Sequence, residues 1–155
     1  MDIVQEALAV YAKQAPKVKD KTLSVPDNDI YSNKILTSYL IHDGMSYEEF
    51  ERISHMGLLT LQDWADLLSL SYKSLQRYKV SQSRFKPIYT EKILEVSEVL
   101  SVGMQVFEDK KKLKLWLQTP SYALDNMRPI KLMTNSYGKD LVLDELVRIE
   151  HGIFS

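Results

Sequence analysis

The chain of 155 residues contains no cysteine. This absence excludes a disulfide framework, a thiolate metal site and a cysteine nucleophile, and it fits a reducing compartment. The sequence also lacks an apolar run of membrane-spanning length, and Asp2 and Glu6 stand where a secretory signal has its basic region. We therefore expect a cytoplasmic protein that is neither exported by that route nor embedded in a membrane.

The chain has little excess charge, with a formal net charge of −1 at pH 7. Any contact with nucleic acid must therefore come from a local basic patch and not from the field of the whole protein. The composition, 45% hydrophobic and 26% charged residues, is that of a globular chain. One compact body, or two small subdomains that share a helix, is the expected organisation.

Signals of catalysis are also scarce. The three histidines, His42, His55 and His151, are scattered, and the sequence has neither an HExxH motif nor a glycine-rich phosphate loop. The acidic group from Glu48 to Glu51 lies in the first turns of an expected helix, where negative charge offsets the helix dipole. We predict no catalytic residue, no metal site and no cofactor, and hence a protein that is not an enzyme.

Helical patterns account for the whole chain, and no segment alternates as a strand does, so the predicted fold class is all-α. Residues 1–14 show apolar positions at helical spacing, and a turn is expected at Pro26. A helix should end near Asp43 because Gly44 suits the left-handed residue after a helix. A long helix is predicted over about 88–108, and shorter ones over 113–117, from Pro129, and over 140–152.

Three side chains mark helix starts in the middle of the chain. Ser46 and Glu49 form a capping-box pair, Thr60 opens a second helix, and Ser71 caps a third. The last two helices are short and separated by a tight turn, which is the pattern of a helix-turn-helix. The residues expected to hold this pair together are Ala65, Leu67, Leu68, Leu70 and Leu75.

The third of these helices has the charge and chemistry to bind DNA. Residues 71–92 contain six basic residues and one acid, whereas residues 46–70 contain one basic residue and five acids. In a helix-turn-helix the second helix places its first residues at base edges in the major groove. The predicted DNA-binding residues are Tyr72, Lys73, Ser74, Gln76, Arg77, Lys79 and Arg84. The alternative is that this is an ordinary helix pair with a solvated basic face.

The C-terminal segment resembles a known family. In order, it has Trp116-Leu117, Pro120, Ala123-Leu124, Pro129, Leu132, Thr134, Gly138, Val142, Leu146, Arg148-Ile149-Glu150 and Gly152. With this order and spacing, the segment looks like the toxin-binding domain of the Xre/MbcA/ParS antitoxin family. It departs from the family pattern at residues 125–127, where a glycine-containing turn is common.

The resemblance implies an antitoxin whose partner is a RES-type toxin that consumes or transfers from NAD. It implies that the antitoxin blocks the toxin's active site and represses their shared promoter by binding operator DNA. The domains expected are an N-terminal helical extension (1–45), a helix-turn-helix part with connecting helices (46–115) and a toxin-binding module (116–155). The toxin contacts expected on this basis are Asn126, Arg128, Tyr137, Lys139, Arg148, Glu150, His151 and Phe154.

Two matters stay open in the sequence. The last helix has more leucine, valine and isoleucine than one buried stripe needs, so part of that surface suits a partner, although Leu146 and Ile149 fit a core equally well. Trp116 is expected in the core.

A homodimer is expected because operators are commonly two-fold. The alternative function is a stand-alone helix-turn-helix transcription regulator whose C-terminal module only dimerises.

Overall fold

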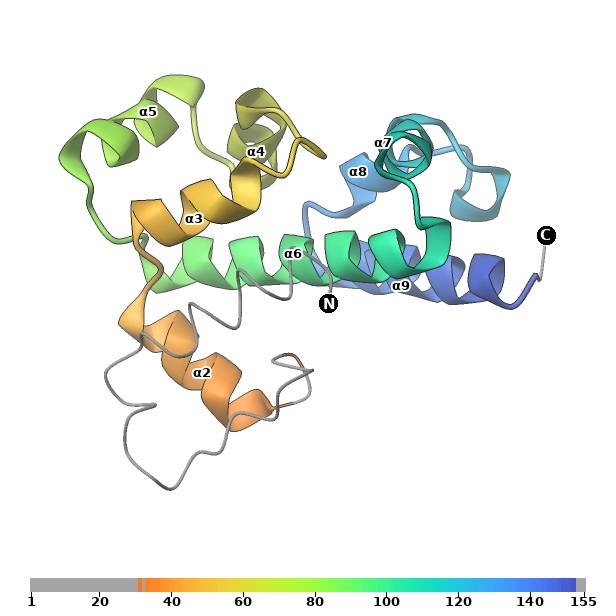
Figure 1. Ribbon diagram of the computed structural model, residues 1–155, viewed down its shortest axis with the longest axis horizontal. Coiled ribbons are helices and arrows are strands. Elements are labelled where there is room, and N and C mark those ends of the chain that lie inside the picture. Colours follow the sequence, from red (N-terminus) through yellow and green to blue (C-terminus); the bar gives the residue numbers. More distant parts are fainter. Residues whose placement is uncertain (1–30, 32, 153–155) are drawn as a thin grey trace.

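The computed structural model describes residue 31 and residues 33–152, and this part of the chain is built of helices (Figure 1). Within it no strand forms, and the only sheet-like pairing is an isolated bridge between Ser121 and Met127. The predicted all-α class is confirmed. The helix predicted over residues 1–14 and the turn at Pro26 lie outside the described residues. The helices are α2 (Lys34–Asp43), α3 (Tyr47–Ser54), α4 (Leu61–Leu67), α5 (Tyr72–Ser81), α6 (Pro87–Phe107), α7 (Lys110–Gln118), the 3₁₀ helix η1 (Tyr122–Leu124), α8 (Pro129–Leu132) and α9 (Ser136–Glu150).

The long helix α6 packs against α9, α2 and α7. In Figure 1, α3, α4 and α5 lie on one side of its N-terminal half, α7 and α8 lie on the same side over its C-terminal half, α2 lies on the opposite side, and α9 runs alongside the C-terminal half. The predicted apolar stripe of α6 is buried at Ile93, Val96 and Leu100, whereas Met104 and Phe107 are only half-buried. The C-terminal segment therefore shares its core with the helix that precedes it.

The predicted helix starts are confirmed in detail. At α3, the Ser46 hydroxyl accepts from the Glu49 amide at 3.2 Å, and the Glu49 carboxylate accepts from the Ser46 amide at 2.7 Å. Thr60 and Asp63 form the same reciprocal pair at the start of α4. Ser71 caps α5, and Gly44 follows α2 at a φ of 82°. These short-range signals needed no tertiary context to be found.

Two predicted starts were wrong. Helix α7 begins at Lys110 and not at Leu113, because the Asp109 carboxylate accepts from the amides of Lys111 and Lys112 and makes the lysine run its first turn. Helix α9 begins at Ser136 and not at Asp140, because the Asn135 side chain accepts from the amide of Gly138 at 2.9 Å. Gly138 therefore lies inside α9, and its φ is not positive.

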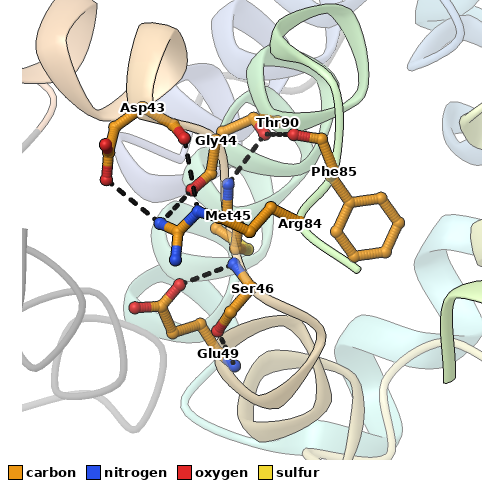
Figure 2. A network of polar contacts seen from close by, with 8 residues as sticks. All are labelled: Asp43, Gly44, Met45, Ser46, Glu49, Arg84, Phe85 and Thr90. Carbon is orange, nitrogen blue, oxygen red and sulfur yellow. Dashed lines mark hydrogen bonds and ion pairs between the residues drawn. The ribbon is translucent and has the colours of Figure 1, made fainter. Parts of the chain in front are cut away.

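The junction between α2 and α3 is tied to the junction between α5 and α6 (Figure 2). The Phe85 amide donates to the Met45 carbonyl at 2.7 Å, and the Met45 amide donates to the Thr90 hydroxyl at 3.0 Å. A Cβ atom on Gly44 would lie 2.5 Å from the Phe85 carbonyl oxygen, so only glycine permits this approach. The contact holds the loop between α5 and α6 against the loop between α2 and α3.

Replacing Thr90 with valine is expected to lower the free energy of unfolding by about 1–3 kcal/mol, because the fully buried Met45 amide would lose its acceptor. Valine has nearly the shape of threonine, so the loss reports on the hydrogen bonds of the hydroxyl, which also donates to the Phe85 carbonyl at 3.4 Å. Urea unfolding measures it, with Thr134→Val as the control, since the Thr134 hydroxyl is exposed. Equal stability of the two variants would contradict this account.

Candidate functional site

The basic face of α5 projects away from the core. Leu75 anchors the helix with 2% of its surface exposed, and the predicted pair contacts Ala65, Leu67 and Leu68 are buried as well. Leu70 is partly buried against the same core. The two helices and their packing residues are thus as predicted, while their use as a DNA-binding helix-turn-helix stays a prediction.

Six of the seven predicted DNA-binding residues lie on α5 itself. All of them are exposed except Ser74, which is half-buried and whose amide donates to the capping hydroxyl of Ser71. Tyr72 has 43% of its surface exposed at the first position of the helix, a position suited to a base edge. The residues that share this helix are Tyr72, Lys73, Ser74, Gln76, Arg77 and Lys79.

Arg84 differs from the other six because its guanidinium is held by protein groups. It donates to the Asp43 carboxylate at 3.0 Å, to the Asp43 carbonyl at 3.3 Å and to the Gly44 carbonyl (Figure 2). The side chain is still half-exposed. Arg84 therefore links the loop after α5 to the end of α2, a role that the sequence did not reveal.

The turn at residues 125–127, where the sequence departs from the family pattern, forms without glycine. Asp125 and Asn126 adopt left-handed conformations, with φ of 55° and 60°. Aspartate and asparagine tolerate this region better than other non-glycine residues. The Asn126 side chain is exposed beside the turn, so this predicted toxin contact is accessible.

Arg128 lies in a crevice between the C-terminal segment and α4. Its guanidinium is 3.5 Å from the Gln118 side-chain oxygen. The crevice, of about 230 Å³, has Asp63 and Asp66 of α4 among its lining residues together with Lys131 of α8. The helix pair and the C-terminal segment thus meet at this crevice, where α4 contributes acidic side chains and the C-terminal segment contributes basic ones.

Lys139 is also engaged within the protein. Its ammonium is 3.2 Å from the Glu98 carboxylate of α6 and 3.6 Å from that of Asp140, with 17% of the side chain exposed. Burial lowers the pKa of Lys139, but the carboxylates of Glu98, Asp140 and Glu95 outweigh it and raise the pKa above its usual value. Lys139 therefore joins α9 to α6, which makes it a weaker candidate for toxin contact than its exposed neighbours.

Replacing Glu98 with glutamine is expected to cost about 0.5–1 kcal/mol of stability at pH 7, the range of partly exposed pairs. Because the folded pKa of Lys139 is raised, the pair stabilises fully below the unfolded value of about 10.5, and this contribution disappears as pH rises through the higher folded value. Urea unfolding at pH 7 and pH 11 tests this. A stability difference that is equal at both pH values would contradict the ion-pair account.

The remaining predicted toxin contacts lie on α9 and just beyond it. Tyr137 has 88% of its surface exposed. Arg148, Glu150 and His151 are exposed at the far end, where Arg148 is 3.5 Å from the Glu145 carboxylate. Phe154 lies outside the described residues. Tyr137 is thus separated along α9 from the other three by about three turns of helix.

Several exposed apolar side chains were not singled out from the sequence. Tyr122, within the C-terminal segment, has 81% of its surface exposed, and Leu115 of α7, just before that segment, has 70%. Leu141 and Val147 of α9 are also exposed, whereas Leu146 is fully buried. Trp116 is half-buried against Phe107, with ring centres 5.6 Å apart, and the buried tryptophan is Trp64. The apolar excess of the last helix is therefore divided between core and surface.

The described part of the chain contains neither a cluster of metal ligands nor a membrane-spanning helix. Over residue 31 and residues 33–152, no group of three or more histidine or acidic side chains is placed to hold a metal ion. Over the same residues, no helix combines the length and the apolar character needed to cross a bilayer. The three histidines are exposed and lie on α2, after α3 and after α9.

Comparison with known proteins identifies the C-terminal part. Residues 103–152 match the family described as the antitoxin Xre/MbcA/ParS C-terminal toxin-binding domain. The match confirms the resemblance seen from Trp116 onward and extends it into the last residues of α6. The C-terminal part of the chain is therefore similar to the toxin-binding domain of Xre/MbcA/ParS antitoxins.

A curated relative agrees with this assignment. Over 84 residues the chain is 33% identical to Antitoxin Xre of Yersinia enterocolitica serotype O:8 / biotype 1B (strain NCTC 13174 / 8081). The aligned stretch covers 54% of this chain and 57% of that protein, so the chain spans little more than half the length of the relative.

Proposed function

We propose that this protein is the antitoxin of a type II toxin–antitoxin pair and not an enzyme. It acts in the cytoplasm by binding a RES-type toxin, blocks the active site where that toxin consumes NAD, and represses its own operon. The observation that supports the proposal most is the match of residues 103–152 to a toxin-binding domain.

The toxin-binding surface that we propose combines exposed aromatic and charged groups of α9 and its surroundings. Aromatic and arginine side chains supply most of the energy at protein interfaces. Tyr137 and Tyr122 are the most exposed large apolar residues of this segment, and Arg148 is exposed at the other end of α9. We propose Tyr137 and Arg148 as the main contacts near the two ends of α9, and the half-buried Lys139 as a minor one.

Co-expression with the toxin encoded beside this gene tests the proposal. The chain should restore growth, and Tyr137→Ala with Arg148→Ala should fail to do so while remaining folded, because both side chains are exposed. Lys112→Ala with Lys114→Ala, an exposed pair on α7, is the control and should still protect. Full protection by the Tyr137 and Arg148 variant, together with unchanged toxin affinity, would refute this surface.

Deletion of residues 116–155 is a poor test of the same idea. Val142 and Leu146 of α9 are fully buried in the core that α6 supplies, so the deletion removes part of the fold together with the surface. We therefore propose the boundaries 1–45, 46–115 and 116–155 as divisions between functional regions, and not between parts that fold separately. Paired surface substitutions separate the roles more cleanly than truncation.

Operator binding is proposed for the exposed face of α5, in a homodimer that presents two such faces to a two-fold site. A promoter fragment should be shifted by the protein, and Lys73→Ala with Gln76→Ala, at exposed positions nearer the N-terminal end of α5, should abolish sequence preference. Light scattering should give the mass of a dimer, alone or on DNA. A promoter shift with no toxin-like gene nearby would favour the alternative, a stand-alone regulator.

A further inference from the structure

A cationic hollow lies beside the C-terminal half of α5, away from the end expected to reach base edges. It measures about 460 Å³, and it is lined by three basic side chains, three serines, Leu70 and Tyr78. All of its charged lining residues are positive. We call it the α5 hollow, and its polar residues are Arg77, Arg84, Lys86, Ser74, Ser81 and Ser83.

We propose that the α5 hollow binds a phosphate group. The proposal rests on the proposed function where that phosphate belongs to the DNA backbone, and a free phosphate ion has the same recognition chemistry. Guanidinium, ammonium and hydroxyl groups are the donors that proteins use for phosphate oxygens. No acidic side chain lines the hollow to repel the anion.

The hollow is held in shape before any ligand arrives. Arg84 is fixed by Asp43 and Gly44, as Figure 2 shows, and the hydroxyls of Ser81 and Ser83 are 2.7 Å apart in a hydrogen bond. The Tyr78 ring stacks on Phe85 with ring centres 4.4 Å apart. Because the Ser81 hydroxyl gives its single hydrogen to the Arg77 carbonyl, Ser83 donates to Ser81; this pair shapes the hollow, and Arg77 and Lys86 supply donors for the anion. A site that is already shaped loses less entropy on binding than a flexible one.

Charge is available in the hollow because two of its cations are not neutralised. Arg84 is compensated by Asp43, but neither Arg77 nor Lys86 forms an ion pair with a carboxylate anywhere in the described part of the chain. These two side chains come from different elements, α5 and the loop before α6, and line one hollow. The net positive charge therefore resides mainly on Arg77 and Lys86.

One effect opposes the proposal, since the end of a helix carries partial negative charge on its last carbonyls. Here one of those carbonyls, that of Lys79, accepts from the Gln82 side-chain amide at 2.6 Å, and the Arg77 carbonyl, one turn before the helix end, accepts from the Ser81 hydroxyl at 2.8 Å. These bonds reduce the repulsion that an anion would meet, and the formal charges of Arg77 and Lys86 exceed the remaining partial charge.

The full chain and Arg77→Gln with Lys86→Gln are compared in two titrations. In the first, inorganic phosphate is added at constant ionic strength, and amide NMR shifts are followed at Ser74, Ser81 and Ser83. In the second, duplex DNA is bound at several salt concentrations. The matched control is Lys112→Gln with Lys114→Gln, which removes the same charge from exposed positions on α7.

Saturable phosphate shifts at these serines, lost in the Arg77 and Lys86 variant and kept in the control, are the expected result. If the phosphate is that of DNA, the variant should also bind duplex about tenfold more weakly, with a salt slope shallower by about 1. Phosphate binding without any duplex binding by the full chain would uphold the hollow for a free anion and count against operator binding.

The proposal is overturned if phosphate leaves the serine amides unchanged while the variant binds duplex with the full chain's salt slope. In that outcome operator binding by the N-terminal end of α5 is unaffected, so the two ideas fail separately. Circular dichroism of each variant verifies that it is folded, and Arg84 is left intact because its contacts hold the loop in place.

Discussion

Replacing Gly138 with alanine is expected to lower the free energy of unfolding by about 3 kcal/mol or more, the upper range for overpacking a core. A Cβ atom at this position would lie 1.8 Å from the carbonyl oxygen of Leu132 and 2.7 Å from its carbonyl carbon. These are backbone atoms of the turn from α8 to α9, which no rotamer change can move. The two helices would have to separate, and thermal or urea unfolding would measure the loss.

Gly103 is the matched control, because it is also a buried helical glycine but faces a side chain. A Cβ there would meet the Leu113 methyl groups at 2.5 and 3.0 Å, and a methyl group at the end of a leucine side chain can shift. We expect Gly103→Ala to cost clearly less than Gly138→Ala. If the two variants unfold alike, the close approach at Leu132 is not what requires glycine at position 138.

Local signals were predictable from the sequence because they depend on a few neighbouring residues. The caps at Ser46, Thr60 and Ser71, and the end of α2 at Gly44, each satisfy backbone groups within three or four positions. The start of α9 was missed for a related reason. Asn135 is also a capping residue, but the role of Gly138, three positions later, depends on its close approach to Leu132 at the end of α8.

Long-range roles could not be predicted in this way. Arg84 meets Asp43, 41 residues earlier, and Lys139 meets Glu98, also 41 residues away. Arg84 was predicted as a DNA contact from the basic charge of its segment, and Lys139 was predicted as a toxin contact from the family resemblance. The Arg84 pair joins the loop after α5 to the end of α2, and the Lys139 pair joins α9 to α6. Charge marks a residue as polar, but only the fold decides whether its partner is a ligand, a macromolecule or a neighbouring helix.

The candidate surfaces show the same division. The exposed positions of α5 followed from helical periodicity, because one face had to pack against α4. In α9 the apolar residues lie on more than one face of the helix, so helical periodicity did not show which of them are buried. The structure makes that separation, with Leu146 at 0% and Leu141 at 53% exposure.

Substituting alanine for Leu146 is expected to lower the free energy of unfolding by about 2–5 kcal/mol, because it leaves a cavity between α9 and α6. Val142, one turn earlier, is also fully buried, so little can move in to fill the space. Leu141→Ala should change stability by less than about 0.5 kcal/mol, since its side chain is mostly in solvent.

The affinity for the toxin should show the reverse order of effects from stability, provided that both variants are measured in the folded state. Leu141→Ala removes an exposed apolar group beside Tyr137 and is expected to weaken the complex severalfold, whereas folded Leu146→Ala should retain most of its affinity. Calorimetry at a temperature where both variants are folded separates the two effects. Leu146→Ala reports on the core and Leu141→Ala on the surface. If only Leu146→Ala lost affinity, the toxin would not contact the face of α9 that carries Leu141.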